Sequence, residues 1–269
     1  MADGVGHALL NDLPWLPPFT TLCIHPSGYL QNRTRGGLRK EPPLHCFRPM
    51  RTWLYVDGFN LYYGAVRATP LRWLNPVVLA QQAFPANQII RTKYFTAALP
   101  PSASDPMQAA RQQAYWRALR SLGDVEIIEG HFRVRQVWAP LAQPPPPMAQ
   151  IIRHEEKGSD INLAAHLMAD GFGGEYQAAI VISGDSDFTT PVRMVREKVG
   201  RPVGVLNPQR ISGPGSRSVR NSGGLRRAAS FYQNGVSWSQ LERAQFPAMI
   251  YDVAGIIHRP PEWAPPSAP

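Results

Sequence analysis

Cysteine is scarce in this sequence: Cys23 and Cys46 are the two among 269 residues. Two cysteines cannot form the dense disulfide framework of a small secreted protein, and neither lies in a CxxC pair. No apolar run approaches the roughly 20 residues that cross a bilayer. The first residues lack the basic segment and apolar segment of a secretory signal. We therefore expect a protein of the reducing cytoplasm with no membrane partner.

Acidic residues are also few. There are 19 against 28 lysines and arginines, for a net charge of +9. With 43% hydrophobic and 17% charged residues, the chain does not have the composition of a wholly disordered protein. The basic balance favours a polyanionic partner, with nucleic acid or an anionic membrane as the main classes. Charge alone does not choose between them, and the sequence leaves homo-oligomer formation open.

Several catalytic signatures are missing. No GxGxxG follows the first predicted strand, which argues against a dinucleotide-binding domain. There is no Walker loop with Gly-Lys-Ser/Thr and no GxSxG elbow. The seven histidines form no HExxH, so a zinc site is not expected.

The 28 prolines are unevenly placed and divide the chain. Residues 1–49 mix proline, glycine and scattered aromatics without a helical or strand period, which indicates an irregular or disordered leader. Residues 251–269 read as a proline-rich C-terminal tail. Residues 50–250 form the predicted folded domain.

Apolar runs and helical patterns alternate within this domain, and Trp53 and Phe95 are expected in its core. Strands are predicted at 53–56, 89–96, 125–128, 178–183 and 202–206, and the strand at 202–206 is expected to be the last in the chain. Helices are predicted at 75–84, 105–122, 159–169, 225–232 and 237–244, and a further helix follows the strand at 178–183 and ends at Lys198. A hairpin is predicted around 131–138 and an extended piece at 150–153. Apolar strands separated by helices predict a doubly wound α/β fold with a parallel sheet.

Four aspartates stand where such a sheet places its ligands, at strand ends or a helix start. Asp57 follows the first strand, Asp185 and Asp187 follow the strand at 178–183, and Asp160 opens a helix. Singly, each has an ordinary explanation as a turn residue, a helix cap or a partner of the helix dipole. Together they would gather like charges, which is unfavourable unless a cation binds or some carboxyls stay protonated. An all-oxygen set suits Mg²⁺ or Mn²⁺.

Basic and aromatic residues allow two interpretations each. The segment 210–227 has five arginines and no acid, so it is either a solvated loop or a clamp for nucleic-acid phosphates. Lys157 either approaches a scissile phosphate or balances the neighbouring carboxylates. Four aromatic residues near the acids either stack on bases or, more commonly, pack against the sheet: Phe59, Tyr62, Tyr63 and Phe188.

Three long segments in order, Tyr55–Gly64, Glu155–Leu167 and Val181–Glu197, resemble the NYN domain family, a branch of the PIN-like metal-dependent nuclease superfamily. The likeness runs from about Met50 to Phe246. It implies a three-layer α/β/α sandwich with a central, mainly parallel sheet. It also implies an acidic pocket for Mg²⁺ or Mn²⁺ and endoribonuclease activity.

The resemblance implies roles for particular residues. Asp57, Asp160, Asp185 and Asp187 match the metal-binding catalytic acids. Asn60 would contact a ligand water or a phosphate, and Ser183 and Thr189 would shape the phosphate pocket with their hydroxyl groups. Together with the basic residues considered above, the predicted substrate-binding set is Asn60, Lys157, Ser183, Thr189, Arg210, Arg217 and Arg220.

We therefore predict a metal-dependent ribonuclease acting on single-stranded or structured RNA. One alternative is a non-catalytic RNA-binding or regulatory adaptor module that uses the same pocket. Another is a phosphatase or 5′-nuclease acting on small nucleotides.

Overall fold

The computed structural model describes residues 49–143, 146–213 and 222–264. The chain divides into a unit at residues 1–46 and a unit at residues 47–269, and the described residues all belong to the second. The predicted leader and both cysteines lie outside the described residues, apart from Pro49.

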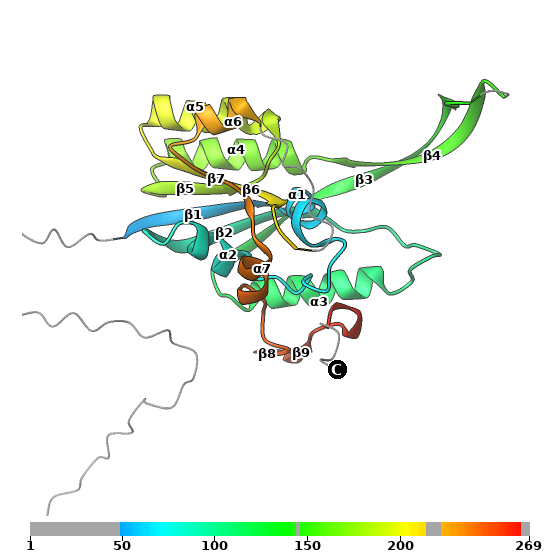
Figure 1. Ribbon diagram of the computed structural model, residues 1–269, viewed down its shortest axis with the longest axis horizontal. Coiled ribbons are helices and arrows are strands. Elements are labelled where there is room, and N and C mark those ends of the chain that lie inside the picture. The colour runs from blue at the N-terminus through cyan, green and yellow to red at the C-terminus, as the bar shows by residue number, and fades with distance from the viewer. Residues whose placement is uncertain (1–48, 144–145, 214–221, 265–269) are drawn as a thin grey trace, which may run out of the picture. The chain divides into compact units, whose positions relative to one another are not determined.

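A seven-stranded sheet forms the middle layer, in the order β4-β3-β2-β1-β5-β6-β7 (Figure 1). Every neighbouring pair is parallel except β3 and β4, which confirms the prediction of a mainly parallel sheet. Its strands are β1 (Met50–Asp57), β2 (Asn87–Ala97), β3 (Val125–Pro140), β4 (Met148–Lys157), β5 (Ala178–Ile182), β6 (Val203–Arg210) and β7 (Phe231–Val236).

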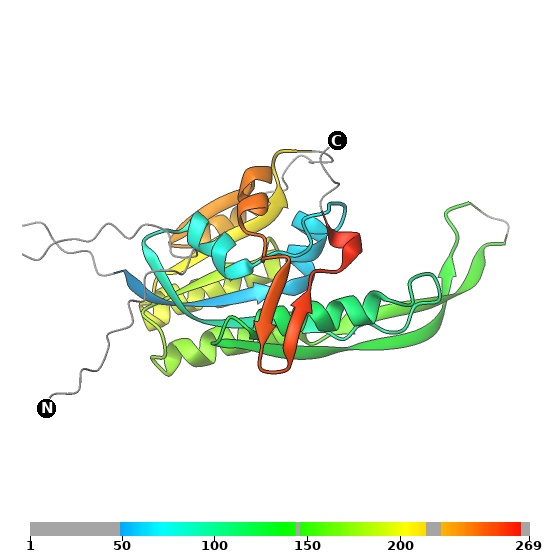
Figure 2. The ribbon, with the colours of Figure 1, turned by 90° about the horizontal axis from the view of Figure 1, so that it is seen from below.

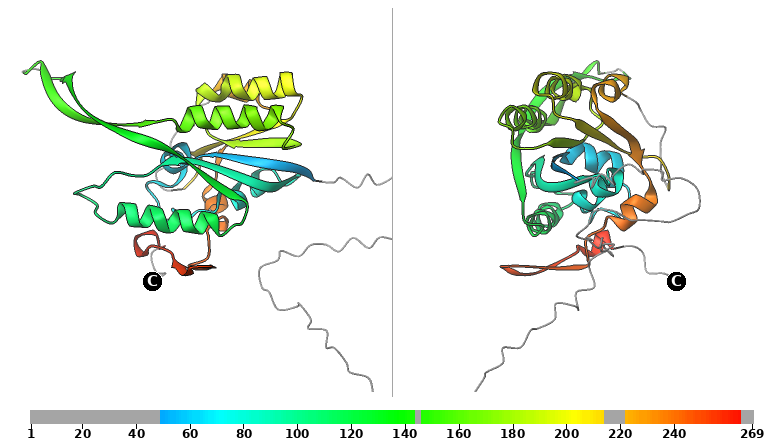
Figure 3. Two further views of the ribbon diagram at one scale, coloured as in Figure 1. Left: turned by 180° about the vertical axis from the view of Figure 1, so that it is seen from behind. Right: turned by 90° about the vertical axis from the view of Figure 1, so that its left-hand side faces the viewer.

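Helices cover both faces of the sheet, so the predicted three-layer α/β/α sandwich is confirmed (Figures 1 and 3). One face carries α4 (Ser159–Phe172), α5 (Thr189–Met194) with its π-helical continuation η3 (Val195–Val199), and α6 (Gly223–Ala228). The other carries α2 (Pro76–Ala83), α3 (Gln108–Arg120) and α7 (Trp238–Arg243). Short turns complete the set: α1 (Gly58–Leu61), η1 (Tyr62–Val66) and η2 (Ser186–Phe188). Among the described residues, no helix has the length and apolar character to span a membrane.

Strand β1 shows why the sheet is buried on both faces. Leu54 and Val56 belong to the hydrophobic core on the α2–α3 side, whereas Trp53 and Tyr55 belong to the core on the α4–α5 side. Successive side chains of a strand point to opposite faces, so a continuous apolar run supplies both cores. Phe95 is fully buried in the α4–α5 core, so the predicted burial of Trp53 and Phe95 is confirmed.

The sheet continues beyond the strand predicted to be its last. The predicted helix at 225–232 ends at Ala228, and Phe231 starts β7, which pairs with β6. The ring of Phe231 fills the space that a Cβ at Gly204 of β6 would need. This pairing partner lies far along the chain, which is why the local pattern misassigned the segment.

Strands β3 and β4 form a long antiparallel arm that runs out past the helices (Figures 1 and 2). The hairpin predicted around residues 131–138 is larger than expected: this segment has no turn and forms part of its first strand, β3. Its partner is β4, with a register that runs from His131 opposite Lys157 to Pro140 opposite Met148. The short extended piece predicted at 150–153 is the middle of β4.

Much of the segment predicted as a C-terminal tail is ordered and packed. β8 (Met249–Asp252) and β9 (Gly255–His258) form an antiparallel pair, followed by the turn η4 (Pro261–Trp263). Trp263 is 9% exposed, and its ring lies 6.2 Å from those of Trp73 and Tyr115. Arg117 of α3 donates from Nε and Nη2 to the two carboxylate oxygens of Asp252. The large aromatic surface of Trp263 holds this segment against α3 in spite of its prolines.

Candidate active site

Asp57 is the last residue of β1 and lies at the carboxyl edge of the sheet. Its side chain accepts a hydrogen bond from the backbone N–H of Asn60 at 2.9 Å and so caps α1. The next residue must be small, because a Cβ at Gly58 would lie 2.7 Å from a ring carbon of Tyr94 and 2.8 Å from the carbonyl oxygen of Phe95. This close approach turns the chain sharply and leaves Asp57 only 4% exposed.

The loop after β5 is tied to Asp57 by hydrogen bonds. The Ser183 hydroxyl donates to Asp57 Oδ2 at 2.9 Å, and the backbone N–H of Asp185 donates to that hydroxyl at 3.1 Å. The backbone N–H of Gly184 donates to Asn60 Oδ1 at 3.0 Å. The structure therefore brings four of the predicted site residues, Asp57, Asn60, Ser183 and Asp185, into one network.

Asp160 reaches the same edge from α4. Gly158 has a φ of 105°, a left-handed conformation that favours glycine, and it lets the chain turn from β4 into the helix. Glu156 Oε1 accepts from the backbone N–H and the hydroxyl of Ser159, at 3.1 and 2.7 Å. These bonds fix the first turn of α4, in which Asp160 lies.

The acids at this edge repel one another. Burial raises the pKa of Asp57 to about 6, and repulsion from Asp160 and Asp185 adds to the shift, although hydrogen bonds from Asn60 and Ser183 oppose it. The pKa of Asp160 is also raised, first by burial and then by repulsion from Asp185, Glu156 and Asp187. Within the described part of the chain, no lysine or arginine forms an ion pair with any of the four aspartates.

This donor set suits a hard divalent cation that keeps part of its hydration shell. Among residues 49–143, 146–213 and 222–264, no three histidine, cysteine or acidic side chains converge on one point as an enclosed metal cage would require. Mg²⁺ commonly binds through one or two carboxylates, with waters and substrate phosphates as its other ligands. Asp57 and Asp185, joined through Ser183, fit this open arrangement.

Two further predicted residues, Lys157 and Thr189, lie apart from this network, whereas Asp187 adjoins it through Asp185. Lys157 is exposed and pairs with Glu155 at 3.3 Å. Of the two interpretations of Lys157, this contact favours the one in which it balances a neighbouring carboxylate. Thr189 faces α6, since a Cβ at Gly224 would lie 3.3 Å from its hydroxyl oxygen. Asp187 lies in the turn η2, where its N–H donates to Asp185 Oδ1 at 2.9 Å.

The prediction that Arg210 binds nucleic-acid phosphates is wrong. This side chain is 7% exposed, donates to the carbonyl oxygen of Ala65 at 3.1 Å and lies 5.8 Å from the ring centre of Trp238. A buried guanidinium held by η1 supports that turn and does not face a solvent-borne phosphate. Arg217 and Arg220 lie outside the described residues.

The aromatic residues near the acids divide by exposure. Phe188 is 1% exposed and packs in the α4–α5 core. Phe59 meets Phe132 of the arm edge to face at 5.9 Å. Tyr63 is 58% exposed, and its ring contacts that of Tyr62 at 5.3 Å. Packing therefore accounts for Phe188, while Tyr63 is open to a partner.

A basic face on the arm was not predicted. The cross-strand register puts Arg133 opposite Glu155 and Arg135 opposite Arg153, all exposed or half-buried. We call Arg133, Arg135, Arg153 and Lys157 the basic arm face; Glu155 lies on it too and pairs with Arg153 and Lys157. Like charges directly opposite each other destabilise a sheet. The signal was present as the alternate arginines in RVR, whereas Arg153 and Lys157 in RHEEK flank Glu155, and the face needed the pairing of the two strands.

The model of the NYN domain family matches residues 51–230. This chain belongs to the NYN domain family. The match covers every strand from β1 to β6 and all four aspartates of the site. The NYN domain is part of the PIN-like nuclease superfamily, so both the predicted family and the predicted fold are confirmed.

Two similar proteins give context to this NYN domain. The 6-hydroxy-3-succinoylpyridine 3-monooxygenase HspA of Pseudomonas putida (strain DSM 28022 / S16) is 29% identical over 229 residues, which cover 75% of this chain and 72% of that protein. A protein of unknown function from Vibrio parahaemolyticus RIMD 2210633, known from a crystal structure, is 18% identical with a TM-score of 0.43, covering 71% of this chain and 93% of that one.

Proposed function

We propose that this NYN domain protein is a metal-dependent ribonuclease of the cytoplasm that hydrolyses RNA phosphodiester bonds where β1 and β5 end. The observation that carries the proposal is the mutual repulsion of Asp57, Asp160, Asp185 and Asp187, which have no cationic partner among the described residues. A divalent cation is the counter-ion that such oxygen donors favour.

The residues around Asp57 are arranged to present a fixed carboxylate. Each of its oxygens accepts one hydrogen bond, from Asn60 N–H or from the Ser183 hydroxyl, and keeps further lone pairs for a cation. Asn60 uses its side-chain oxygen to hold Gly184, so its amide NH₂ group is the part that can donate to a phosphate or a water. Bound Mg²⁺ or Mn²⁺ would lower the pKa of a water and neutralise charge on the phosphate.

The basic arm face is the surface that we assign to RNA. Phosphate groups between Arg135 and Arg153 would relieve their repulsion and release counter-ions, which favours binding at low salt. Strand β4 ends at Lys157, three positions before Asp160, so phosphates bound along the arm lead toward the acidic edge. Tyr63 is 58% exposed and could stack on a base.

Cleavage of end-labelled RNA by the purified protein tests the proposal. We expect Mn²⁺-dependent cleavage that EDTA stops, and a loss of about 100-fold or more in Asp57→Asn and Asp185→Asn, since even residues that only orient metal ligands contribute 10- to 100-fold. Asp124→Asn, an exposed aspartate before β3, is the matched control. Full activity in both site variants would disprove the assignment. Binding to RNA without cleavage would point to the adaptor module instead.

The relative that is named a monooxygenase favours a second candidate. Its similarity extends over three quarters of this chain, so oxygenation of a hydroxypyridine is the competing function. A monooxygenase reaction uses one O₂, two electrons from a reductant and two protons; one oxygen atom enters the organic product and the other leaves as water. Oxygen uptake with NADH and 6-hydroxy-3-succinoylpyridine tests it. Uptake coupled to product, with no RNA cleavage under any metal, would replace the nuclease proposal.

A further inference from the structure

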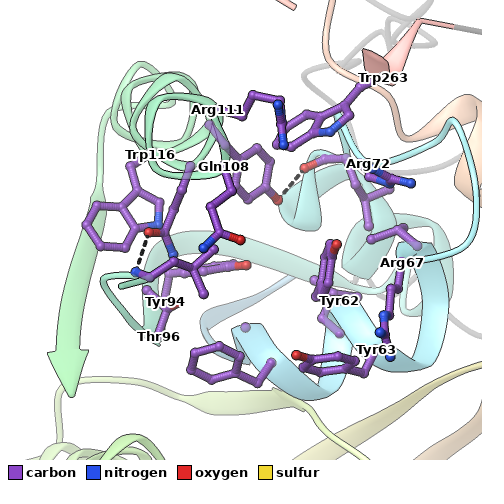
Figure 4. A pocket seen from close by; sticks show the side chains of 18 of the residues that line it. Tyr62, Tyr63, Arg67, Arg72, Tyr94, Thr96, Gln108, Arg111, Trp116 and Trp263 are labelled. Atoms are coloured by element: carbon purple, nitrogen blue, oxygen red, sulfur yellow. Dashed lines mark hydrogen bonds between the residues drawn. The ribbon is translucent and has the colours of Figure 1, made fainter. Parts of the chain in front are cut away.

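A pocket of about 300 Å³ lies on the α3 side of the sheet, at the lower end of the range for small-molecule sites. It is formed by α1 and η1, the end of β2, α3 and the turn η4 (Figure 4). Among its described lining residues Asp105 is the only acid, so the pocket is separate from the four site aspartates. It approaches that site through Gly58 and Phe59, which follow Asp57, and through Tyr94, which pairs with Val56.

Seven aromatic residues line this pocket, and several of their rings are fixed. The Tyr115 hydroxyl donates to the carbonyl oxygen of Leu74 at 2.7 Å, and Tyr94 and Trp116 are 5% and 3% exposed. Trp263 is held from the other side, because its neighbour Glu262 pairs with Arg111 at 3.1 Å. Flat rings on several sides favour a planar, apolar guest. Figure 4 shows the rings of Tyr62, Tyr63, Tyr94, Trp116 and Trp263 around the pocket.

The guanidinium group of Arg72 lines this pocket, and its buried Nε has no acceptor among the described residues. Buried donors are normally paired, so a guanidinium group without partners at a pocket wall needs an explanation. Arg111, also in the lining, is neutralised by Asp105 and Glu262. Arg72 forms no ion pair within the described part of the chain, so its positive charge is available.

We propose that this pocket binds a small molecule that joins one planar aromatic ring to one anionic group. The ring lies among the aromatic walls, and the anionic oxygens lie against the guanidinium group of Arg72. A free aromatic carboxylate and a mononucleotide share this chemistry. The proposal goes beyond the ribonuclease function and uses none of its acids.

Isothermal titration calorimetry of the full chain in EDTA tests the pocket. The probes are indole-3-acetate and adenosine 5′-monophosphate, with cyclohexanecarboxylate as the anion without an aromatic ring and benzamide as the uncharged ring. We expect at least one of the two aromatic anions to bind at least about tenfold more tightly than both controls. Arg72→Gln should weaken its binding about tenfold or more, as expected for a charge-assisted hydrogen bond. Arg193→Gln, an exposed arginine of α5, should leave binding unchanged.

Trp263→Leu keeps an apolar side chain and removes one aromatic wall, so it should also weaken binding while the protein stays folded by circular dichroism. Tighter binding of indole-3-acetate indicates that the natural ligand is a free aromatic acid. Tighter binding of adenosine 5′-monophosphate indicates that it is a nucleotide. Equal binding of cyclohexanecarboxylate, unchanged affinity in both folded variants, or no heat with either aromatic probe would overturn the proposal. Asp185→Asn should still bind the probe, so loss of cleavage and loss of this site are distinguishable.

Discussion

Replacing Asp57 by asparagine should make the metal-free protein more stable at neutral pH. The pKa of Asp57 is raised from 3.8 to about 6 in the fold, where the side chain is 4% exposed. Between these two pH values the folded protein keeps a proton that the unfolded chain has lost. The stabilisation from this proton is therefore full below the unfolded-state pKa and is lost as the pH rises through about 6.

The size of this effect follows from the pKa difference. Each pH unit corresponds to about 1.4 kcal/mol, so the free energy of unfolding falls by about 3 kcal/mol as Asp57 ionises. Asparagine has the shape of a protonated aspartate. Its oxygen can accept from Asn60 N–H, and its NH₂ group can donate to the Ser183 hydroxyl. The variant should equal the wild type near pH 4 and exceed it by up to about 3 kcal/mol at pH 7.5.

Urea unfolding in EDTA at several pH values from 4 to 7.5 measures this difference. Asp124→Asn serves as the control for the substitution itself. A gap between wild type and Asp57→Asn that stays constant with pH would refute the argument from burial and repulsion. Adding Mn²⁺ at about 100 times its dissociation constant should restore about 2.7 kcal/mol to the wild type at pH 7.5, and less to the variant.

Three further outcomes are expected. Asp170→Asn should lower the free energy of unfolding by about 3 kcal/mol or more in urea, because it leaves Lys93, 7% exposed and 2.6 Å from Asp170, without its counter-charge; a loss below about 1 kcal/mol would contradict this. Gly204→Ala should lower the melting temperature, since its new methyl group meets the ring of Phe231 at a cost of about 1–3 kcal/mol, and an unchanged melting curve would count against the β6–β7 packing. Arg135→Gln should reduce the slope of log affinity for single-stranded RNA against log salt by about 0.7, and an unaltered slope would remove the arm from the interface.

Local pattern was enough to predict the centre of the sheet. The runs at 53–56 and 178–183 are apolar on both faces and are followed directly by Asp57 and by Gly184-Asp185, so the strands and the acidic edge could be located together. The doubly wound α/β fold followed from the alternation of such runs with helices, and the three-layer sandwich from the resemblance to the NYN domain family. The roles of the four acids in metal binding remain predictions.

Features that depend on distant partners could not be predicted. Strand β7 forms because Phe231 packs over Gly204, and Arg210 is buried because η1 offers it the carbonyl oxygen of Ala65. The basic arm face requires the register that puts Arg135 beside Arg153. In each case the local residues allow more than one conformation, and the tertiary contact selects between them.

The order of the strands bears on how the domain folds during synthesis. β1 leaves the ribosome first, yet it lies in the interior of the sheet, where Thr52 pairs with Ala178 of β5. Until that later segment emerges, one edge of an apolar strand stays open to other nascent chains. Fragments that stop before β5 should therefore aggregate, and expression of this protein should benefit from slow translation or a chaperone that shields the early strands.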